Sequence, residues 1–190
     1  MKLLVLLMFV SCAQHQIKLK NEEMVPFTDF SKISRVGSGL KTIAINSVTD
    51  NRENKDQIGM ALTGVKYSQT PIVIDRATNE YLKEYLILSL TDRGFSVNDM
   101  DGINLDVVIN ELWVEELIEK YQPEKAKCKA NLTFYLKEDK TSWSGNYWTE
   151  IVSPGDLSDG TEKIAPTFAY CLNEVVEKLV NDPAFIKNIQ

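Results

Sequence analysis

The chain has 190 residues, of which 44% are hydrophobic and 25% charged, and this composition suits one globular domain with a proper core. Its 21 basic and 27 acidic residues give a net charge of −6, and the basic residues form no concentrated block. Because a protein that binds nucleic acid needs such a block to neutralise phosphates, we expect no nucleic-acid partner and a solvated acidic surface.

The N-terminus has the pattern of a secretory signal. Lys2 is followed by an apolar run over residues 3–10, which is shorter than the roughly 20 apolar residues that a membrane span needs. The run ends in Phe-Val-Ser before Cys12, which resembles the bacterial lipobox, with Phe9 at the position where Leu is usual. We therefore predict that residues 1–11 are a signal peptide and that Cys12 becomes the lipid-modified first residue, carrying palmitate or similar acyl chains.

Residues 12–40 are predicted to be the lipidated N-terminus and a tether, because the polar stretch over residues 14–23 shows no sustained period. The sheet is expected to start only after the glycine-rich turn at 37–39, so that residues 41–190 form a single domain. Ala13, next to the lipidated Cys, resembles the signal for outer-membrane sorting in enteric-type bacteria. The expected location is therefore the cell envelope, with a lipid anchor in the outer membrane and the domain facing the periplasm.

The first part of the domain is predicted to contain two strands and a loop. Residues 41–48 alternate in polarity, residues 49–57 are polar, and residues 71–74 form a short apolar piece. The loop looks at first like a calcium site, but it lacks the glycine at the sixth position and has Ala61 at the twelfth. We expect instead a local Asx-type turn in which Arg52 pairs with a nearby carboxylate, and no metal.

A helix is predicted between Asp75 and Gly94, where apolar residues recur at helical spacing. Asp75 or Thr78 can cap its start, and Gly94 supplies the C′ glycine. The strand that follows has apolar residues at odd positions from Ile103 onward. This phase then shifts, which predicts a β-bulge near Glu111.

Two further strands, over residues 127–136 and 143–151, are predicted to complete an antiparallel meander, because their residues alternate between apolar and polar. A last long helix covers residues 164–179 with Pro166 in its first turn, and Asp182 caps a short terminal helix. The sum predicts a two-layer α+β sandwich, with a mainly antiparallel sheet of about four to six strands and two long amphipathic helices.

Composition limits the catalytic chemistry. The single histidine, His15, lies in the predicted tether, which excludes a Ser-His-Asp triad, a Cys-His pair and a His-based zinc site in the folded domain. Carboxylates such as Glu111, Glu115 and Glu116 could in principle serve acid–base chemistry, but a solvated outer face of the long strand explains them better. We therefore expect no enzyme activity and no cofactor.

Two cysteines remain after Cys12 is assigned to the lipid. Cys128 falls in a predicted strand and Cys171 on the apolar face of a predicted helix, so both are expected to be core residues. In an exported protein they can form a disulfide, and the alternative is a pair of inert buried thiols. The sequence leaves both alternatives open.

The second half of the domain is rich in aromatic residues. Trp143, Tyr147 and Trp148 are candidates for a partner surface, because aromatic residues dominate the energetics of interfaces. The alternative is that they fill the sheet core and form cross-strand pairs, and this interpretation is favoured.

Several stretches resemble the YajG-type lipoproteins of bacterial envelopes, an uncharacterised family. They are Thr42-Ile43-Ala44-Ile45, Asp50-Asn51-Arg52 with Ile58-Gly59, the helix end at 90–95, and the run at 105–109. The resemblance covers residues 40–190 and the lipobox. It implies a lipid-anchored periplasmic domain with no assigned enzymatic activity, so it carries over no catalytic residue.

The resulting hypothesis is a non-enzymatic accessory lipoprotein that binds a protein partner or another envelope component while Cys12 holds it at the membrane. The alternative is a lipid- or glycan-binding carrier with an apolar cleft, lined by Trp143, Trp148 or Leu112. A carboxylate-dependent hydrolase ranks last, since it needs two converging acids in a cleft.

Overall fold

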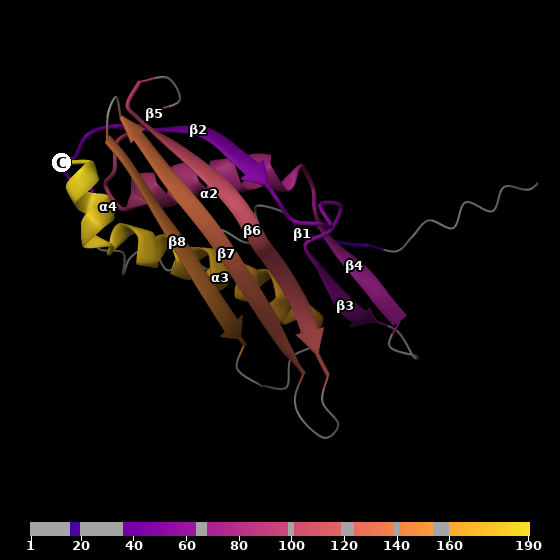
Figure 1. Ribbon diagram of the computed structural model, residues 1–190. Coiled ribbons are helices and arrows are strands. Elements are labelled where there is room, and N and C mark those ends of the chain that lie inside the picture. Colours follow the sequence, from indigo (N-terminus) through magenta and orange to yellow (C-terminus); the bar gives the residue numbers. More distant parts are fainter. Residues whose placement is uncertain are drawn as a thin grey trace, which may run out of the picture.

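The computed structural model describes residues 16–19, 36–63, 68–98, 101–118, 124–138, 141–153 and 160–190 (Figure 1). The predicted signal peptide and Cys12 lie outside these residues. The strands are β1 (Ile17–Leu19), β2 (Ile43–Asp50), β3 (Gly59–Thr63), β4 (Ser68–Ile74), β5 (Val97–Asn98), β6 (Ile103–Leu117), β7 (Lys125–Glu138) and β8 (Thr141–Val152). The helices are α2 (Thr78–Asp92), α3 (Gly160–Val180) and α4 (Pro183–Asn188).

The long strand β6 organises the sheet. One edge of β6 pairs antiparallel with β7 from Asn104 to Leu117, and β7 pairs antiparallel with β8. The opposite edge of β6 pairs in parallel first with β2 and then, at Val114 and Glu115, with β3. Because β5 extends the sheet beyond β2, and β4 and β1 extend it beyond β3, the strands form one open, curled sheet (Figure 1).

The α+β class predicted from the sequence is confirmed, but the sheet is larger than predicted. The described residues form eight strands in one sheet instead of about four to six. Most of the paired residues are antiparallel, as predicted, and parallel pairings of β1 with β4, β2 with β5, and β6 with both β2 and β3 make the sheet mixed. The reason is the long connection through α2, which returns the chain parallel to β2, whereas the short links within β6, β7 and β8 produce the predicted meander.

The sheet also begins earlier in the chain than predicted. Ile17–Leu19 form β1, which pairs in parallel with residues 72–74 of β4. Leu19 is 3% exposed and belongs to the core, so one apolar side chain anchors this short segment at the edge of the sheet. A strand of three residues is too short for its alternation to be recognised in the sequence.

Helices α2 and α3 cover one face of the sheet (Figure 1). α2 lies against β2, and α3 lies against β7 and β8. Tyr81 of α2 and Phe168 of α3 are fully buried, and their ring centroids lie 6.1 Å apart. The opposite face of β6, β7 and β8, here called the outer face, is not covered by the described helices. Each helix in the described part of the chain is too short or too polar to traverse a lipid bilayer.

The C-terminal end of α2 is capped by a glycine, as predicted. Gly94 has a φ of +84°, a value that a residue without Cβ adopts at little cost. Its N–H donates to the carbonyl of Thr91 at 2.9 Å, and the N–H of Phe95 donates to the carbonyl of Leu90 at 3.1 Å. These two bonds make a Schellman motif, which satisfies carbonyls that the helix leaves without partners.

The helix starts agree with the sequence in one case and differ in two. The carboxylate of Asp182 caps α4 as predicted, since it accepts the N–H of Ala184 at 2.7 Å. The N-cap of α2 is Ala77, without a side-chain hydrogen bond. α3 begins at Gly160, so Pro166 lies beyond its first turn. Pro166 has no N–H for the carbonyl four residues earlier and its ring crowds that carbonyl, yet the helix extends upstream through this turn to Gly160.

The predicted β-bulge is confirmed. The register of β6 with β7 shifts between Ile109 and Glu111, and the buried positions of β6 then move to Leu112 and Val114. The bulge lies where β6 exchanges its partner β2 for β3. It therefore bends the central strand at the junction between the two halves of the sheet.

Candidate functional site

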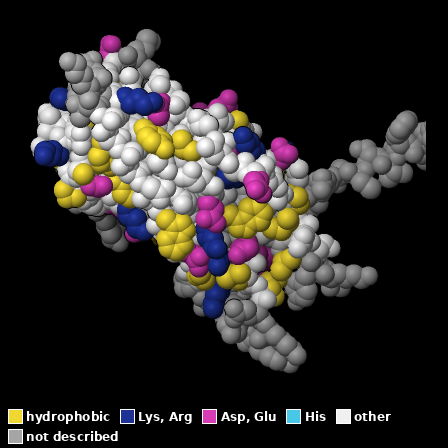
Figure 2. All heavy atoms as spheres, viewed as in Figure 1, with side chains coloured by type: hydrophobic (Ala, Val, Ile, Leu, Met, Phe, Trp, Pro, Cys, Tyr) yellow, Lys and Arg dark blue, Asp and Glu magenta, His cyan; other side chains and the backbone are white. Residues whose placement is uncertain are grey.

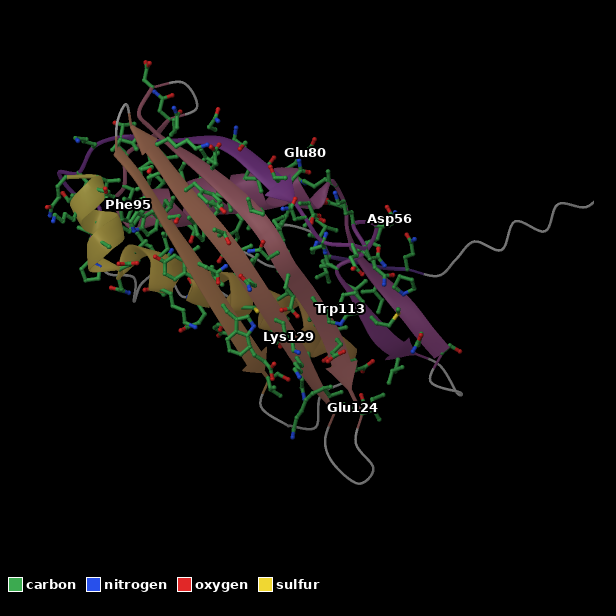
Figure 3. All side chains as sticks on the ribbon, viewed as in Figure 1. Asp56, Glu80, Phe95, Trp113, Glu124 and Lys129 are labelled. Carbon is green, nitrogen blue, oxygen red and sulfur yellow. The ribbon has the colours of Figure 1, made fainter. Side chains whose placement is uncertain are left out.

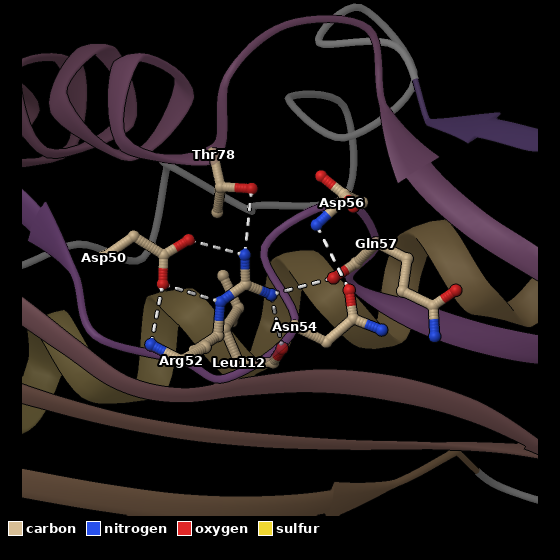
Figure 4. A network of polar contacts seen from close by, with 7 residues as sticks. All are labelled: Asp50, Arg52, Asn54, Asp56, Gln57, Thr78 and Leu112. Atoms are coloured by element: carbon tan, nitrogen blue, oxygen red, sulfur yellow. Dashed lines mark hydrogen bonds and ion pairs between the residues drawn. The ribbon is translucent and has the colours of Figure 1, made fainter.

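Arg52 lies at the centre of a polar network where β2 ends (Figure 4). Its Nε donates to Oδ1 of Asp50 at 2.9 Å, and its Nη2 donates to Oδ2 at 2.7 Å. Nη1 donates to the carbonyls of Gln57 at 3.0 Å and Leu112 at 3.1 Å, while Nη2 also donates to the Thr78 hydroxyl at 3.1 Å. The side chain therefore ties the loop after β2 to the bulge of β6 and to the start of α2.

This geometry gives the Asp50-Asn51-Arg52 motif a structural role. Arg52 is 8% exposed. Burial alone would raise the pKa of the Asp50 carboxyl, but the hydrogen bonds and charge of Arg52 outweigh it and hold this pKa below its ordinary value. The predicted local turn, with Arg52 paired to a carboxylate, is confirmed, because the N–H of Arg52 also donates to Asp50 at 3.1 Å. The guanidinium of Arg52 therefore binds the carboxylate of Asp50, the residue that would be the first ligand of a calcium loop.

We expect Arg52→Lys to lower the free energy of unfolding by about 1–2 kcal/mol, because lysine keeps the charge but loses the planar fork of donors. Urea unfolding followed by circular dichroism measures this loss. Arg76→Lys is the matched control, since Arg76 pairs with Asp75 and Glu84 at the surface. Its effect should be much smaller, because solvent screens ion pairs at the surface. Equal losses at the two positions would contradict the role assigned to the network.

Two of the three aromatic candidates on β8 face the helices. Trp143 packs on Phe185 of α4 with ring centroids 5.4 Å apart, and Tyr147 lies 5.8 Å from Phe134. The Tyr147 hydroxyl donates to Oδ2 of Asp182 at 2.6 Å. Burial, and then this hydrogen bond, raise the pKa of Tyr147 above its ordinary value. Both side chains are half-buried and hold α4 against β8.

Trp148 points the other way. Alternation along the strand places it on the outer face, where it is 51% exposed. The structure therefore does not bring Trp143, Tyr147 and Trp148 onto one surface. It also separates Trp148 from Leu112, which is 1% exposed within the core. Trp148 therefore shares no cleft with Trp143 or Leu112, although the carrier hypothesis required only one of the three residues to line an apolar cleft.

Trp148 belongs to an exposed patch on the outer face. We define the Trp148 patch as the residues Trp113, Lys127, Lys129, Trp148, Glu150 and Val152, which the registers of β6, β7 and β8 bring together. Glu150 forms ion pairs with Lys127 at 3.2 Å and Lys129 at 3.6 Å, while Val152 is 46% exposed. Figure 2 shows apolar, basic and acidic side chains interleaved on this face, and Figure 3 shows Trp113 on β6 beside Lys129 on β7.

The neighbouring part of the outer face is polar, and its side chains bond to one another. Asn146 donates to Asn131 at 2.7 Å and to Thr133 at 2.8 Å, and Asn110 donates to Thr133 at 2.7 Å. These groups already satisfy part of one another's hydrogen-bonding capacity. The Trp148 patch instead presents apolar area to solvent, which makes it the region of this face best suited to contact a partner.

The carboxylates considered for hydrolysis do not all lie on one face of the sheet. Glu115 accepts a hydrogen bond from the indole N–H of Trp113 at 3.3 Å, and the strand register places Glu111 on the same outer face. Glu116 points to the opposite face, is 6% exposed and accepts the N–H of Leu62 at 2.8 Å. Glu115 and Glu116 are thus separated by the sheet itself and cannot act on one bond.

The two cysteines of the domain meet in the core. Cys128 on β7 and Cys171 on α3 are both completely buried, as predicted, and both thiols are free. Burial in the apolar core, followed by the neighbouring Cys171, raises the pKa of the Cys128 thiol. Elements that are far apart in the sequence therefore place two oxidisable thiols near each other in the core.

The sequence pattern predicts the correct face for the lysines of the Trp148 patch. It does not predict which residues of the neighbouring strands lie beside them. Alternation over residues 127–136 predicts Lys127 and Lys129 on the solvent side, and the strand pattern confirms this. The contact of Trp113 with Lys129 depends instead on the register between β6 and β7. That register passes through a bulge, so it cannot be counted from the residue pattern alone.

A family of lipoproteins matches most of the chain. The family model Lipoprotein_16, described as an uncharacterized lipoprotein, matches residues 34–190. The chain belongs to this lipoprotein family. The match confirms the resemblance to an uncharacterised lipoprotein family, and membership implies a membrane-anchored protein of the cell envelope.

Solved structures share the fold of this lipoprotein at low sequence identity. The crystal structure of an uncharacterized protein is similar with a TM-score of 0.52 and 10% identity, over 87% of this chain and 97% of its own. Protein XCC0632 from Xanthomonas campestris is similar with a TM-score of 0.51 and 12% identity, over 89% of this chain and 85% of its own. No curated protein matches significantly in sequence. The structural likeness shows the fold alone.

Proposed function

We propose that this lipoprotein is a non-enzymatic accessory protein that is anchored in the outer membrane through Cys12, faces the periplasm, and binds a protein partner through the Trp148 patch. The observation that carries this proposal is Trp148 itself, a large aromatic side chain left half exposed on a sheet face that the described helices do not cover. The family membership supports the anchored location, and the lipobox supports Cys12 as the anchor.

The chemistry of the patch suits a protein surface. An aromatic ring offers a large apolar area with little side-chain entropy to lose, and such residues supply most of the binding energy at interfaces. The ion pairs of Glu150 with Lys127 and Lys129 flank Trp148 and can exchange partners with charges on an incoming surface. This combination of an apolar centre with a charged border favours a protein over a purely apolar ligand.

Anchoring explains how a patch of modest size can suffice. A domain confined to a membrane surface meets partners in the same membrane at a high effective concentration, so weak contacts produce a populated complex. Ala13 after the lipidated Cys12 supports the outer membrane as that surface. Both residues lie outside the described structure, and their role rests on the sequence pattern.

Site-specific photo-crosslinking tests the partner surface. The full-length protein carrying p-benzoylphenylalanine at position 148 is expected to form a discrete adduct in intact cells, because the probe replaces the side chain at the centre of the contact. The matched control carries the same probe at Tyr170 of α3, which is 52% exposed but lies away from the patch. Gel shift and mass spectrometry identify the adduct. The same adduct at both positions, or none at position 148, would refute the proposed surface.

The anchor is tested separately with Cys12→Ser. This variant is expected to incorporate no radiolabelled palmitate and to lose most of the position-148 adduct, since its local concentration at the membrane falls. Palmitate that labels neither the variant nor the unmodified protein would refute the lipid anchor. An undiminished adduct in the variant would refute the contribution of tethering.

A further inference from the structure

The contact between the two domain cysteines connects the two layers of the fold. Cys128 lies in the middle strand of the antiparallel meander, and its side chain points toward the helices. Cys171 lies on the face of α3 that packs against β7. Both side chains are completely buried in the core between these two packed elements, and Cys171 lies near enough to raise the pKa of the Cys128 thiol. A covalent bond between them would join the sheet layer to the helix layer.

We infer that Cys128 and Cys171 form a disulfide in the exported protein. This inference rests on the location outside the cytosol stated in the proposed function, because disulfides persist in such compartments and rarely in the cytosol. Because α3 packs on β7 with both cysteines in the core, the bond requires only that the two sulfur atoms approach to a covalent distance of about 2 Å. The free thiols then represent the reduced form of this pair.

The reaction is a thiol–disulfide exchange with a protein or small-molecule disulfide as the oxidant. The thiolate of one cysteine attacks a sulfur of the oxidant, which releases one thiol and leaves a mixed disulfide. The thiolate of the second cysteine then attacks the protein's own sulfur in that mixed disulfide and releases the second thiol. The cysteines lose two protons and two electrons in total, and the oxidant accepts both electrons to become two thiols.

Burial decides when this exchange takes place. An oxidant cannot reach two sulfur atoms that are completely enclosed, and the raised pKa of Cys128 keeps that thiol protonated in the folded domain. Exchange therefore belongs to the stage of folding before α3 docks on β7. Once closed, the bond is protected from reductants by the same burial.

The test counts free thiols in the full-length protein. Cells that export the protein are quenched in acid, and the denatured protein is treated with a maleimide carrying a large polyethylene glycol, with and without prior reduction. Each free thiol adds one step in gel mobility. We expect no step before reduction and two steps after it, because Cys12 is blocked by its lipid while Cys128 and Cys171 become free. Two steps in both samples would overturn the disulfide.

The same experiment separates this inference from the proposed anchor. If Cys12 is not lipidated but the disulfide is present, the counts become one step before reduction and three after it. If both are wrong, three steps appear in both samples. The single variants Cys128→Ala and Cys171→Ala are controls, and each should show one step with or without reduction. A bond to another protein would instead appear as a larger species on a non-reducing gel.

A second measurement does not depend on labelling. A disulfide that closes a loop of about 40 residues restricts the unfolded chain, so the purified protein, after reduction in denaturant and refolding in the presence of reductant, is expected to have a Tm lower by about 5–15 °C. The Cys171→Ala variant should show no change on reduction. An unchanged Tm for the unmodified protein on reduction would contradict the disulfide even if the thiol count were ambiguous.

Discussion

Replacement of Arg93 by alanine is expected to lower the free energy of unfolding by about 3 kcal/mol. Arg93 is completely buried at the end of α2, where its Nη1 donates to the carbonyl of Ser89 at 2.8 Å. Its Nη2 donates to Asn173 at 2.7 Å, and its Nε donates to Glu177 at 3.0 Å, both on α3. Alanine would leave these acceptors without their donor and create a cavity between the two helices.

Urea unfolding followed by circular dichroism measures this loss. Arg76→Ala is the control, because it removes an arginine that pairs with Glu84 and Asp75 at the surface, where solvent screening keeps the expected cost small. Glu177→Gln provides a second comparison, since it removes the charge of the acceptor but keeps an amide oxygen in its place. A loss at Arg93 no larger than that at Arg76 would show that this buried bridge does not hold the helices together.

Gly59→Ala is expected to be at least as destabilising, with a loss of about 3–5 kcal/mol. A Cβ at Gly59 would lie 1.8 Å from the carbonyl oxygen of Val114 and 2.8 Å from the carbonyl carbon. The obstruction is backbone rather than a flexible side chain, so β3 would have to move away from β6. That movement would break the hydrogen bond from Val114 N–H to the Ile58 carbonyl, which measures 2.8 Å.

The informative control is Gly39→Ala. A Cβ at Gly39 meets no atom within 4 Å, although its φ of +82° makes alanine strained there, at a cost of about 1 kcal/mol. The two variants therefore separate backbone strain from steric exclusion, and thermal unfolding ranks them. A smaller loss at Gly59 than at Gly39 would mean that β3 and β6 are not packed as closely as described.

Local features of this fold could be predicted from the sequence where their signal lies within a few residues. The Gly94 helix end and the bulge near Glu111 are examples, since each depends on a short pattern of residues. The alternation of β7 likewise predicted that Cys128 is buried. In these cases the backbone conformation follows from the residues that adopt it.

Features that depend on partners far away in the sequence could not be predicted from the residue pattern. The partners of Arg93 on α3 are about 80 residues away in the chain, so no local sequence pattern predicts this contact. The parallel pairing of β2 with β6 is a similar case, because pairing depends on how α2 returns the chain.

The candidate site was partly predictable for the same reason. Alternation assigns each residue of β8 to one of two faces, which is enough to separate Trp148 from Trp143 once the strand is known. Grouping Trp148 with Lys129 and Trp113 requires the registers of two strand pairs. Side-chain chemistry was therefore readable from the sequence, while the neighbours that turn it into a surface were not.

Strand β1 changes how far the domain can stand from its membrane. With Cys12 as the lipid attachment point, only about five residues separate the acyl chains from Ile17, and a fully extended chain of that length spans at most about 18 Å. The short linker would therefore hold the β1–β4 edge of the sheet close to the membrane, whereas a long linker would let the domain reorient freely. Such a short linker limits the distance that the domain can reach and the orientations in which it can meet a neighbour.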